Sequence, residues 1–282
     1  MTMAQQTAHN TYLPGYAPKQ VQHHEWRNAE NSAAYLLPTL QQKARDNPNL
    51  SLLDVGAGSG TITASLAKYM PRGQITATDL SEEILPRAKE FADKAGASNI
   101  SFRQASVYEL PFPEGSFDIV HASMVLCHLD SPVQALKEML RVAKPNGGIV
   151  ACRESDLRMW SYYPQLSGLE KTHRLQLAVH EAAGGSIDGG AKLVSWAMQA
   201  EATRDQITAS FGTWCYSTPV ERAIWGNTMA ERVRHGGMRQ KGLEMGIATE
   251  ADLKEMAEAW DEWVATENAC LGCMHGEILI RK

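Results

Sequence analysis

One stretch of the chain, SLLDVGAGSGTITASLAKYM at Ser51–Met70, restricts the possible folds more than any other part of the sequence. It opens with the short apolar run SLLDV, which is typical of a buried strand. A glycine-rich turn, GAGSG, follows from Gly56 to Gly60, and a helical pattern runs from Thr61 to Tyr69. A strand, a glycine turn and a helix in this order predict the first βα unit of an α/β sheet.

The same alternation continues beyond this unit. We expect further strands at QITATD, ISFRQA, FDIVHAS, GIVACRE, DQITASFGTWCYS and HGEILIRK, and helices over 82–95 and 132–142. Short apolar strands that alternate with helices indicate a parallel sheet with both faces covered. After Glu154 the pattern turns helical, which predicts helical insertions at about 157–204 and 219–269. Residues 1–45 are predicted to form an N-terminal arm with helices, and 46–282 the main domain.

Composition excludes several classes of protein. The chain has 282 residues, 44% of them hydrophobic, and a net charge of −5, which suits a large α/β domain without a nucleic-acid partner. Neither a membrane-spanning run nor a signal peptide is found, so we expect a cytoplasmic protein that acts on a small molecule. Five cysteines, an odd number, predict free thiols, and the pair Cys270 and Cys273 lacks the second ligand pair of a zinc site. No metal is therefore predicted, and the oligomeric state stays open.

The spacing of the glycines separates two classes of nucleotide-binding turn. A dinucleotide fingerprint, G-x-G-x-x-G, would place its third glycine at position 61, where this chain has Thr61. Here the third glycine is Gly60, and the strand carries Asp54, where dinucleotide sites usually have an apolar residue. Asp79 follows Gly60 by 19 residues and ends the next strand, where a carboxylate accepts hydrogen bonds from ribose hydroxyls. Asp79 does not distinguish between the two classes of turn, because NAD enzymes also have an acidic residue at this position.

The G-x-G-x-G turn with Asp54 resembles motif I of the class I S-adenosylmethionine-dependent methyltransferases. The segment QASVYELPFPEGSFDIVHASMVLCHLDSPVQALKEMLRVAKPNGG is similar to the ubiquinone/menaquinone-biosynthesis C-methyltransferase family, and the likeness extends over about 50–155. The whole chain is also similar to fungal members that modify secondary metabolites, among them enzymes that S-methylate the dithiol of reduced gliotoxin-type compounds. The resemblance implies a doubly wound, Rossmann-like sheet of seven mostly parallel strands with an antiparallel last strand. It also implies S-adenosylmethionine as cofactor and S-adenosylhomocysteine as product.

The resemblance also implies a set of cofactor-binding residues. These are Tyr16, Arg27, Asp54, Gly56, Ala57, Gly58, Gly60, Thr61, Asp79, Leu80, Ala105, Ser106, Val107, His121 and Ala122. Arg27 would pair with the cofactor carboxylate from a segment folded over the cofactor, and His121 and Ala122 would act through backbone groups. The family has Gly-Asp-Ala where this chain has Ala105-Ser106-Val107, so the contact with adenine would fall to the Ser106 hydroxyl and the Val107 N–H. The turn K-P-G-G also carries an extra Asn146.

Candidates for chemistry and for substrate binding follow the fourth and fifth strands. His128 and Glu154 are candidate bases; the alternatives are a structural histidine at a helix end and a salt bridge of Glu154 with a neighbouring arginine. Six of the seven tryptophans lie after Glu154, which predicts an aromatic lid over a small-molecule cavity. Trp160, Tyr162 and Trp214 are the candidate substrate contacts, although each can instead pack the insertions onto the core.

The sequence is compatible with three candidate functions. The first is S-methylation of a thiol or dithiol in a secondary metabolite. The second is C- or O-methylation of a quinone, phenolic or polyketide metabolite. The third is a regulator that binds the cofactor without turnover.

Overall fold

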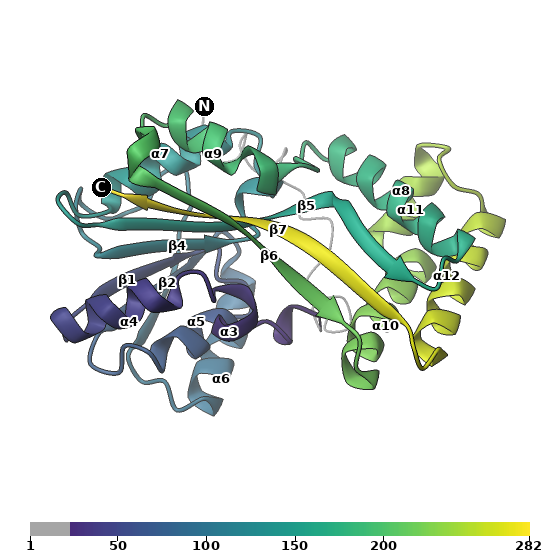
Figure 1. The fold of residues 1–282 in the computed structure, drawn as a ribbon, viewed down its shortest axis with the longest axis horizontal. Coiled ribbons are helices and arrows are strands. Elements are labelled where there is room, and N and C mark those ends of the chain that lie inside the picture. Colours follow the sequence, from purple (N-terminus) through teal and green to yellow (C-terminus); the bar gives the residue numbers. More distant parts are fainter. Residues whose placement is uncertain (1–22) are drawn as a thin grey trace.

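The computed structural model describes residues 23–282, so the predicted contact Tyr16 lies outside the described residues. Seven strands form one sheet in the order β3-β2-β1-β4-β5-β7-β6 (Figure 1). The strands are β1 (Ser51–Val55), β2 (Gln74–Asp79), β3 (Ile100–Gln104), β4 (Ile119–Ser123), β5 (Ile149–Tyr163), β6 (Ile207–Tyr216) and β7 (Cys270–Arg281). Strand β7 pairs antiparallel with both β5 and β6, and the other pairs are parallel. The predicted seven-stranded, mostly parallel sheet with an antiparallel last strand is confirmed.

Helices cover both faces of the parallel part of the sheet. Figure 1 shows one group below the sheet and another above it. The lower group is α3 (Ala29–Ser32), α4 (Leu37–Asp46), α5 (Thr61–Ala67) and α6 (Leu85–Lys94), and the upper group is α7 (Pro132–Val142) and α9 (Gly189–Gln199). Side chains of β1 alternate between two cores: Leu53 and Val55 join the α7–α9 side, and Leu52 joins the α3–α5 side. This alternation follows from the period of two in a strand buried on both faces.

A second group of helices packs against the far ends of β5, β6 and β7 (Figure 1, right). It consists of α8 (Ser167–Ala182), α10 (Pro219–Arg234), α11 (Gly237–Glu244) and α12 (Glu250–Ala265). The starts of α10 and α12 are set by Thr218 and Thr249, whose hydroxyls accept backbone N–H groups in capping boxes. Trp260 and Trp263 are fully buried in the core of this group, so for these two residues packing is the correct interpretation.

The prediction that strand five ends at Glu154 and that helical structure follows from about 157 is wrong. Strand β5 continues to Tyr163, and β7 begins at Cys270 rather than at the predicted His275. The two strands pair up to Ser155 and again from Trp160 to Tyr163, with an irregularity in register between these two positions. The sequence pattern is ambiguous here because the extension is only partly buried, so it lacks a continuous apolar run.

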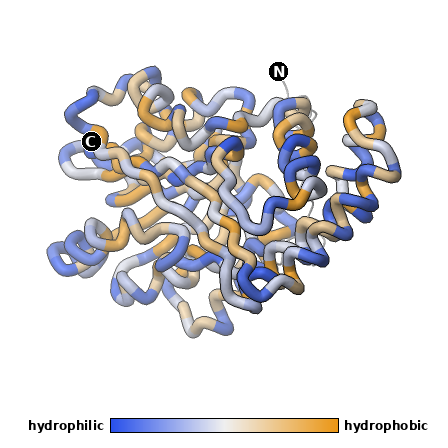
Figure 2. The backbone as a smooth tube through the Cα atoms, turned by 45° about the vertical axis from the view of Figure 1, so that its right-hand side comes forward, coloured by the Kyte–Doolittle hydropathy of each residue, from blue (hydrophilic) through white to orange (hydrophobic). Residues whose placement is uncertain are grey.

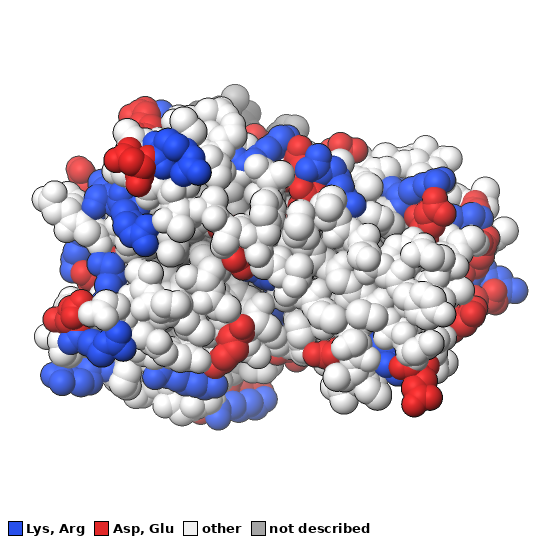
Figure 3. Space-filling model, in the orientation of Figure 1, with Lys and Arg blue, Asp and Glu red and all other residues white. Residues whose placement is uncertain are grey.

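Exposed basic and acidic side chains are intermixed on the described surface, in many places as ion pairs. In Figure 2, hydrophobic stretches concentrate along the central strands and hydrophilic stretches along peripheral turns. Figure 3 shows basic and acidic side chains interspersed around the periphery of one face. Within residues 23–282, every helix is too short or too polar to span a bilayer.

Candidate active site

The glycine turn after β1 brings main chain to the edge of a cavity. Gly56, Gly58 and Gly60 have φ values of 67°, 55° and 74°, a left-handed conformation that favours glycine. A Cβ on Gly60 would lie 2.8 Å from the Cβ of Ala88, so this glycine also permits close packing on α6. A Cβ on Gly58 would meet nothing within 4 Å. The backbone at Gly58 is therefore open to a ligand, whereas Gly60 serves packing.

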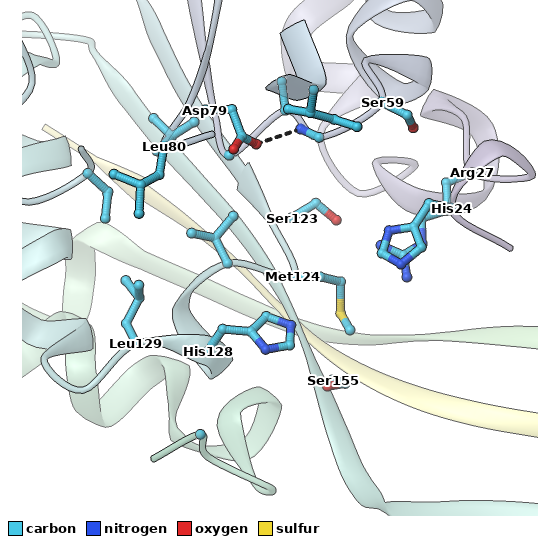
Figure 4. Close-up of a pocket in the computed structure, with 18 of the residues that line it drawn as sticks. His24, Arg27, Ser59, Asp79, Leu80, Ser123, Met124, His128, Leu129 and Ser155 are labelled. Carbon is cyan, nitrogen blue, oxygen red and sulfur yellow. Dashed lines mark hydrogen bonds between the residues drawn. The ribbon is translucent and has the colours of Figure 1, made fainter. Parts of the chain in front are cut away.

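Asp79, at the end of β2, is tied to this turn. Its Oδ2 accepts the N–H of Gly58 at 2.9 Å, drawn in Figure 4, and its Oδ1 accepts the N–H of Ser81 at 3.0 Å. Burial raises the pKa of Asp79, and the nearby Asp54 adds to this effect. The carboxylate still lines the cavity, so it can accept further hydrogen bonds from a ligand.

The carboxylate of Asp54, two residues before the glycine turn, connects this part of the chain to α5 and β4. Its Oδ2 accepts the hydroxyl of Thr63 in the first turn of α5, and its Oδ1 lies 2.8 Å from Nδ1 of His121. The side chain of Asp54 is almost wholly buried, and His121 is fully buried. His121 therefore supports Asp54 rather than facing the cavity.

The cavity has a volume of about 1440 Å³ and runs from the strand ends to the second group of helices. In Figure 4, Asp79 and Leu80 lie at one end of the view and Ser59, His24 and Arg27 at the other, with Ser123 and Met124 between them. The predicted residues that line it are Arg27, Asp54, Gly56, Ala57, Gly58, Thr61, Asp79, Leu80, Ala105, Ser106, Val107, His128, Trp160 and Trp214. The predicted residues that do not line it are Gly60, His121, Ala122, Glu154 and Tyr162.

Glu154 does not line the cavity, so it does not lie where a catalytic base would contact a substrate. Its carboxylate is fully buried and accepts the N–H groups of Val125 at 3.1 Å, Leu126 at 2.9 Å and Cys127 at 3.1 Å. The predicted alternative, a salt bridge, is also wrong, because the neighbouring arginines pair with other acids. Glu154 instead holds the start of the 3-10 helix η2 (Leu126–His128), which carries His128 to the cavity wall.

His128 is the predicted base that does reach the cavity. Burial, with smaller contributions from His180 and Arg27, lowers the pKa of His128 to about 3. The imidazole is therefore neutral at neutral pH and is a weak proton acceptor.

A potential donor set for a metal adjoins His128. Ligand atoms of Cys127, His128 and His180 lie within 4.8 Å of one another. Burial raises the pKa of the Cys127 thiol well above its usual value, so without a metal the sulfur is protonated at neutral pH. His180 Nε2 also lies 3.0 Å from the carbonyl oxygen of Cys127, so this ring is engaged by the backbone. In this conformation Nε2 of His180 is therefore not free to bind a metal.

An aromatic wall closes the far end of the cavity. The ring of Trp160 stacks on His173 with centroids 4.6 Å apart and meets Trp225 edge-on at 5.7 Å. Trp225 and Met238, from α10 and α11, line the cavity but were not predicted. Ser59, Ser123 and Met124 were also missed, although ligands of open α/β sheets bind at the carboxyl ends of strands.

Comparison with known proteins adds to this geometry. A family model described as "Methyltransferase domain" matches residues 53–151. An uncharacterized methyltransferase of Schizosaccharomyces pombe is 36% identical over 269 residues, which cover 92% of each chain. A protein of Aspergillus luteorubrus described as "Probable methyltransferase ltbC" is 31% identical over 303 residues, covering 97% of this chain and 98% of that one.

The chain belongs to the methyltransferase family. This methyltransferase depends on S-adenosylmethionine, as the glycine turn and Asp54 predicted. The likeness to the quinone-biosynthesis enzymes is partial: UbiE of Shewanella sediminis is 32% identical over 111 residues, which are 39% of this chain and 44% of that one. The carboxylate of Asp79 and the main chain at Gly58 line the same cavity, an arrangement that fits a ligand with ribose hydroxyls.

Proposed function

We propose that this methyltransferase methylates the sulfur of a small, partly apolar metabolite, a thiol or dithiol of the gliotoxin type. When bound, S-adenosylmethionine supplies an electrophilic methyl group on a sulfonium that leaves as a neutral thioether. The protein then needs mainly to align the acceptor, which can contribute about 7–11 kcal/mol to lowering the barrier.

Cofactor binding is assigned to the strand ends. Asp79 accepts the ribose hydroxyls, the turn Gly56–Gly60 with Thr61 follows the methionine part, and Ala105–Val107 with Leu80 flank adenine. Arg27, in the segment before α3, pairs with the cofactor carboxylate. All of these residues except Gly60 line one cavity, which supports the assignment.

One observation favours sulfur as the acceptor: of the two predicted bases, His128 lines the cavity but is a weak proton acceptor, and the carboxylate of Glu154 is engaged by backbone N–H groups. A thiol with a pKa of about 8.5 is already a few per cent thiolate at pH 7, so a weak acceptor suffices. A phenol or a carbon acid needs a stronger base.

A second candidate is C- or O-methylation of a flat quinone, phenolic or polyketide ring. The aromatic side chains of Trp160 and Trp225 favour it, because they offer ring faces and edges to a planar substrate. We further propose a cytoplasmic enzyme that acts on free small molecules, with the helical segments after β5 and β6 as its substrate lid. Neither nucleic acid nor a membrane takes part in this proposal.

The acceptor is tested by supplying methyl-labelled S-adenosylmethionine with matched panels of thiols, dithiols, phenols and quinones. We expect label on sulfur, at rates highest for dithiols with apolar substituents. Label confined to oxygen or carbon would replace the thiol proposal by the second candidate. Tight binding of S-adenosylhomocysteine with no labelled product from any panel would favour a regulator.

Replacing His128 by alanine tests how much the reaction relies on a base. We expect kcat for a thiol to fall by about tenfold at most, below the 10²–10⁴-fold contribution that is typical of a general base. Steady-state rates with a thiol and with a more acidic thiol of similar size measure this dependence. A variant that binds S-adenosylhomocysteine normally but transfers no methyl group would show that alignment alone is not the mechanism.

The affinity for S-adenosylhomocysteine should fall as the pH is lowered. Burial raises the pKa of Asp79, so its carboxyl protonates at a higher pH than an exposed aspartate and then loses acceptor capacity. Affinity is therefore full above this raised pKa and declines as the pH falls through it. Titrations of wild type and D79N across acidic pH measure the effect, and D79N should lack the step. Parallel pH curves for the two proteins would remove Asp79 from the site.

A further inference from the structure

Trp214, on β6, contacts two arginine side chains at once. The Cζ atom of Arg27 lies 4.7 Å from the indole centroid, and that of Arg153 lies 4.6 Å from it. Both distances are within the range of cation–π attraction, which strengthens where water is excluded. Trp214 is only 2% exposed, and its Nε1 donates to the carbonyl oxygen of Asn31 at 2.8 Å. The indole thus joins the N-terminal segment to the sheet.

Arg153 is fixed from the side of the sheet. It is buried on β5, and its Nε donates to Oε1 of Glu277 at 3.3 Å. Burial lowers the pKa of Arg153 to about 10, which leaves the guanidinium charged at neutral pH. Oε2 of Glu277 accepts the hydroxyl of Ser210 at 2.8 Å.

Gly212 makes room for this arrangement. A Cβ at position 212 would lie 2.3 Å from Oε1 of Glu277, so a larger residue there must displace the carboxylate. Glycine on β6 therefore allows Glu277 to face Arg153. The result is a continuous row of contacts from Glu277 through Arg153 and Trp214 to Arg27.

We infer that Trp214 is a positioning residue for cofactor binding, not a substrate contact. The Glu277–Arg153 pair holds one side of the indole, and the indole orients the Arg27 guanidinium at the cavity edge toward the cofactor carboxylate. The charge of Arg153 also adds positive potential behind the ring, which favours an anion beside Arg27. This inference rests on the proposed function, because it assigns the carboxylate to Arg27.

Two ligands, one with and one without the amino-acid half of the cofactor, distinguish this positioning role from a merely structural one. S-adenosylhomocysteine carries the amino-acid carboxylate, whereas 5′-methylthioadenosine has the same adenosine and sulfur without it. A residue that acts through Arg27 should affect only the first ligand. A residue that merely supports the cavity should affect both.

Calorimetric titration of both ligands into W214L, W214F and wild type makes this test. We expect W214L to bind S-adenosylhomocysteine about tenfold more weakly. Its affinity for 5′-methylthioadenosine should stay within about twofold of wild type, because no cation–π contact serves that half. W214F keeps an aromatic face, so its loss for S-adenosylhomocysteine should be smaller than that of W214L.

G212A perturbs the row from its other end without changing a cavity residue. G212A should lower the affinity for S-adenosylhomocysteine by about threefold and leave the affinity for 5′-methylthioadenosine unchanged. This variant tests the inference even if W214L does not fold. Equal losses for both ligands, or no loss for either, in the folded variants would overturn the inference. Wild-type protein that binds neither ligand would instead overturn the proposed function.

Discussion

Replacing Asp79 by alanine should weaken the binding of S-adenosylhomocysteine by about 2–4 kcal/mol. The substitution removes a charged acceptor that lines the cavity at the end of β2. It also frees the N–H groups of Gly58 and Ser81, which loosens the glycine turn and adds to the loss. Isothermal titration of wild type and D79A gives the difference directly.

Two controls make the Asp79 result specific. D79N retains one acceptor oxygen, so its loss should lie between those of wild type and D79A. D93A removes an exposed aspartate that pairs with Lys89 on α6 and does not line the cavity, and it should leave the affinity unchanged. Equal affinities of D79A and wild type would exclude Asp79 from the cofactor site.

Replacing Glu154 by alanine should destabilise the fold by about 3 kcal/mol, because three backbone N–H groups lose their buried acceptor. Three N–H groups at the start of η2 depend on this carboxylate. Denaturant unfolding of wild type and E154A, compared at equal m values, measures the loss.

E154Q distinguishes this structural role from the predicted catalytic one. Glutamine keeps an oxygen acceptor for part of the N–H groups, so we expect a smaller loss of stability and nearly normal methyl transfer. A stable E154Q protein without transfer would restore Glu154 as a base. An E154A protein as stable as wild type would contradict the role in holding η2.

The parallel half of the fold and the cofactor end of the site were predictable from the sequence. Strands β1 to β4 are short, and helical patterns separate β1 from β2 and β2 from β3; such local periodicity is readable without contacts between distant residues. The glycine spacing and Asp79 are likewise local signals. They placed Gly56, Gly58 and Asp79 at one cavity, and the structure shows them there.

The features that could not be predicted from the sequence depend on contacts with residues far away along the chain. Glu154 accepts hydrogen bonds from residues 27–29 positions earlier, so nothing next to it marks it as a cap for η2. The extension of β5 to Tyr163 forms through pairing with β7, more than 100 residues later. The cation–π contacts of Trp214 were not predictable either, because Arg27 and Arg153 come from two other segments of the chain.

The arrangement of the whole site is tested most directly by a crystal structure of the protein with S-adenosylhomocysteine. We predict ribose hydroxyls on the carboxylate of Asp79 and the amino-acid carboxylate beside Arg27. The sulfur should face the space bounded by His128 and Trp160. A ligand whose ribose lies away from Asp79, or whose sulfur faces away from that space, would contradict the account.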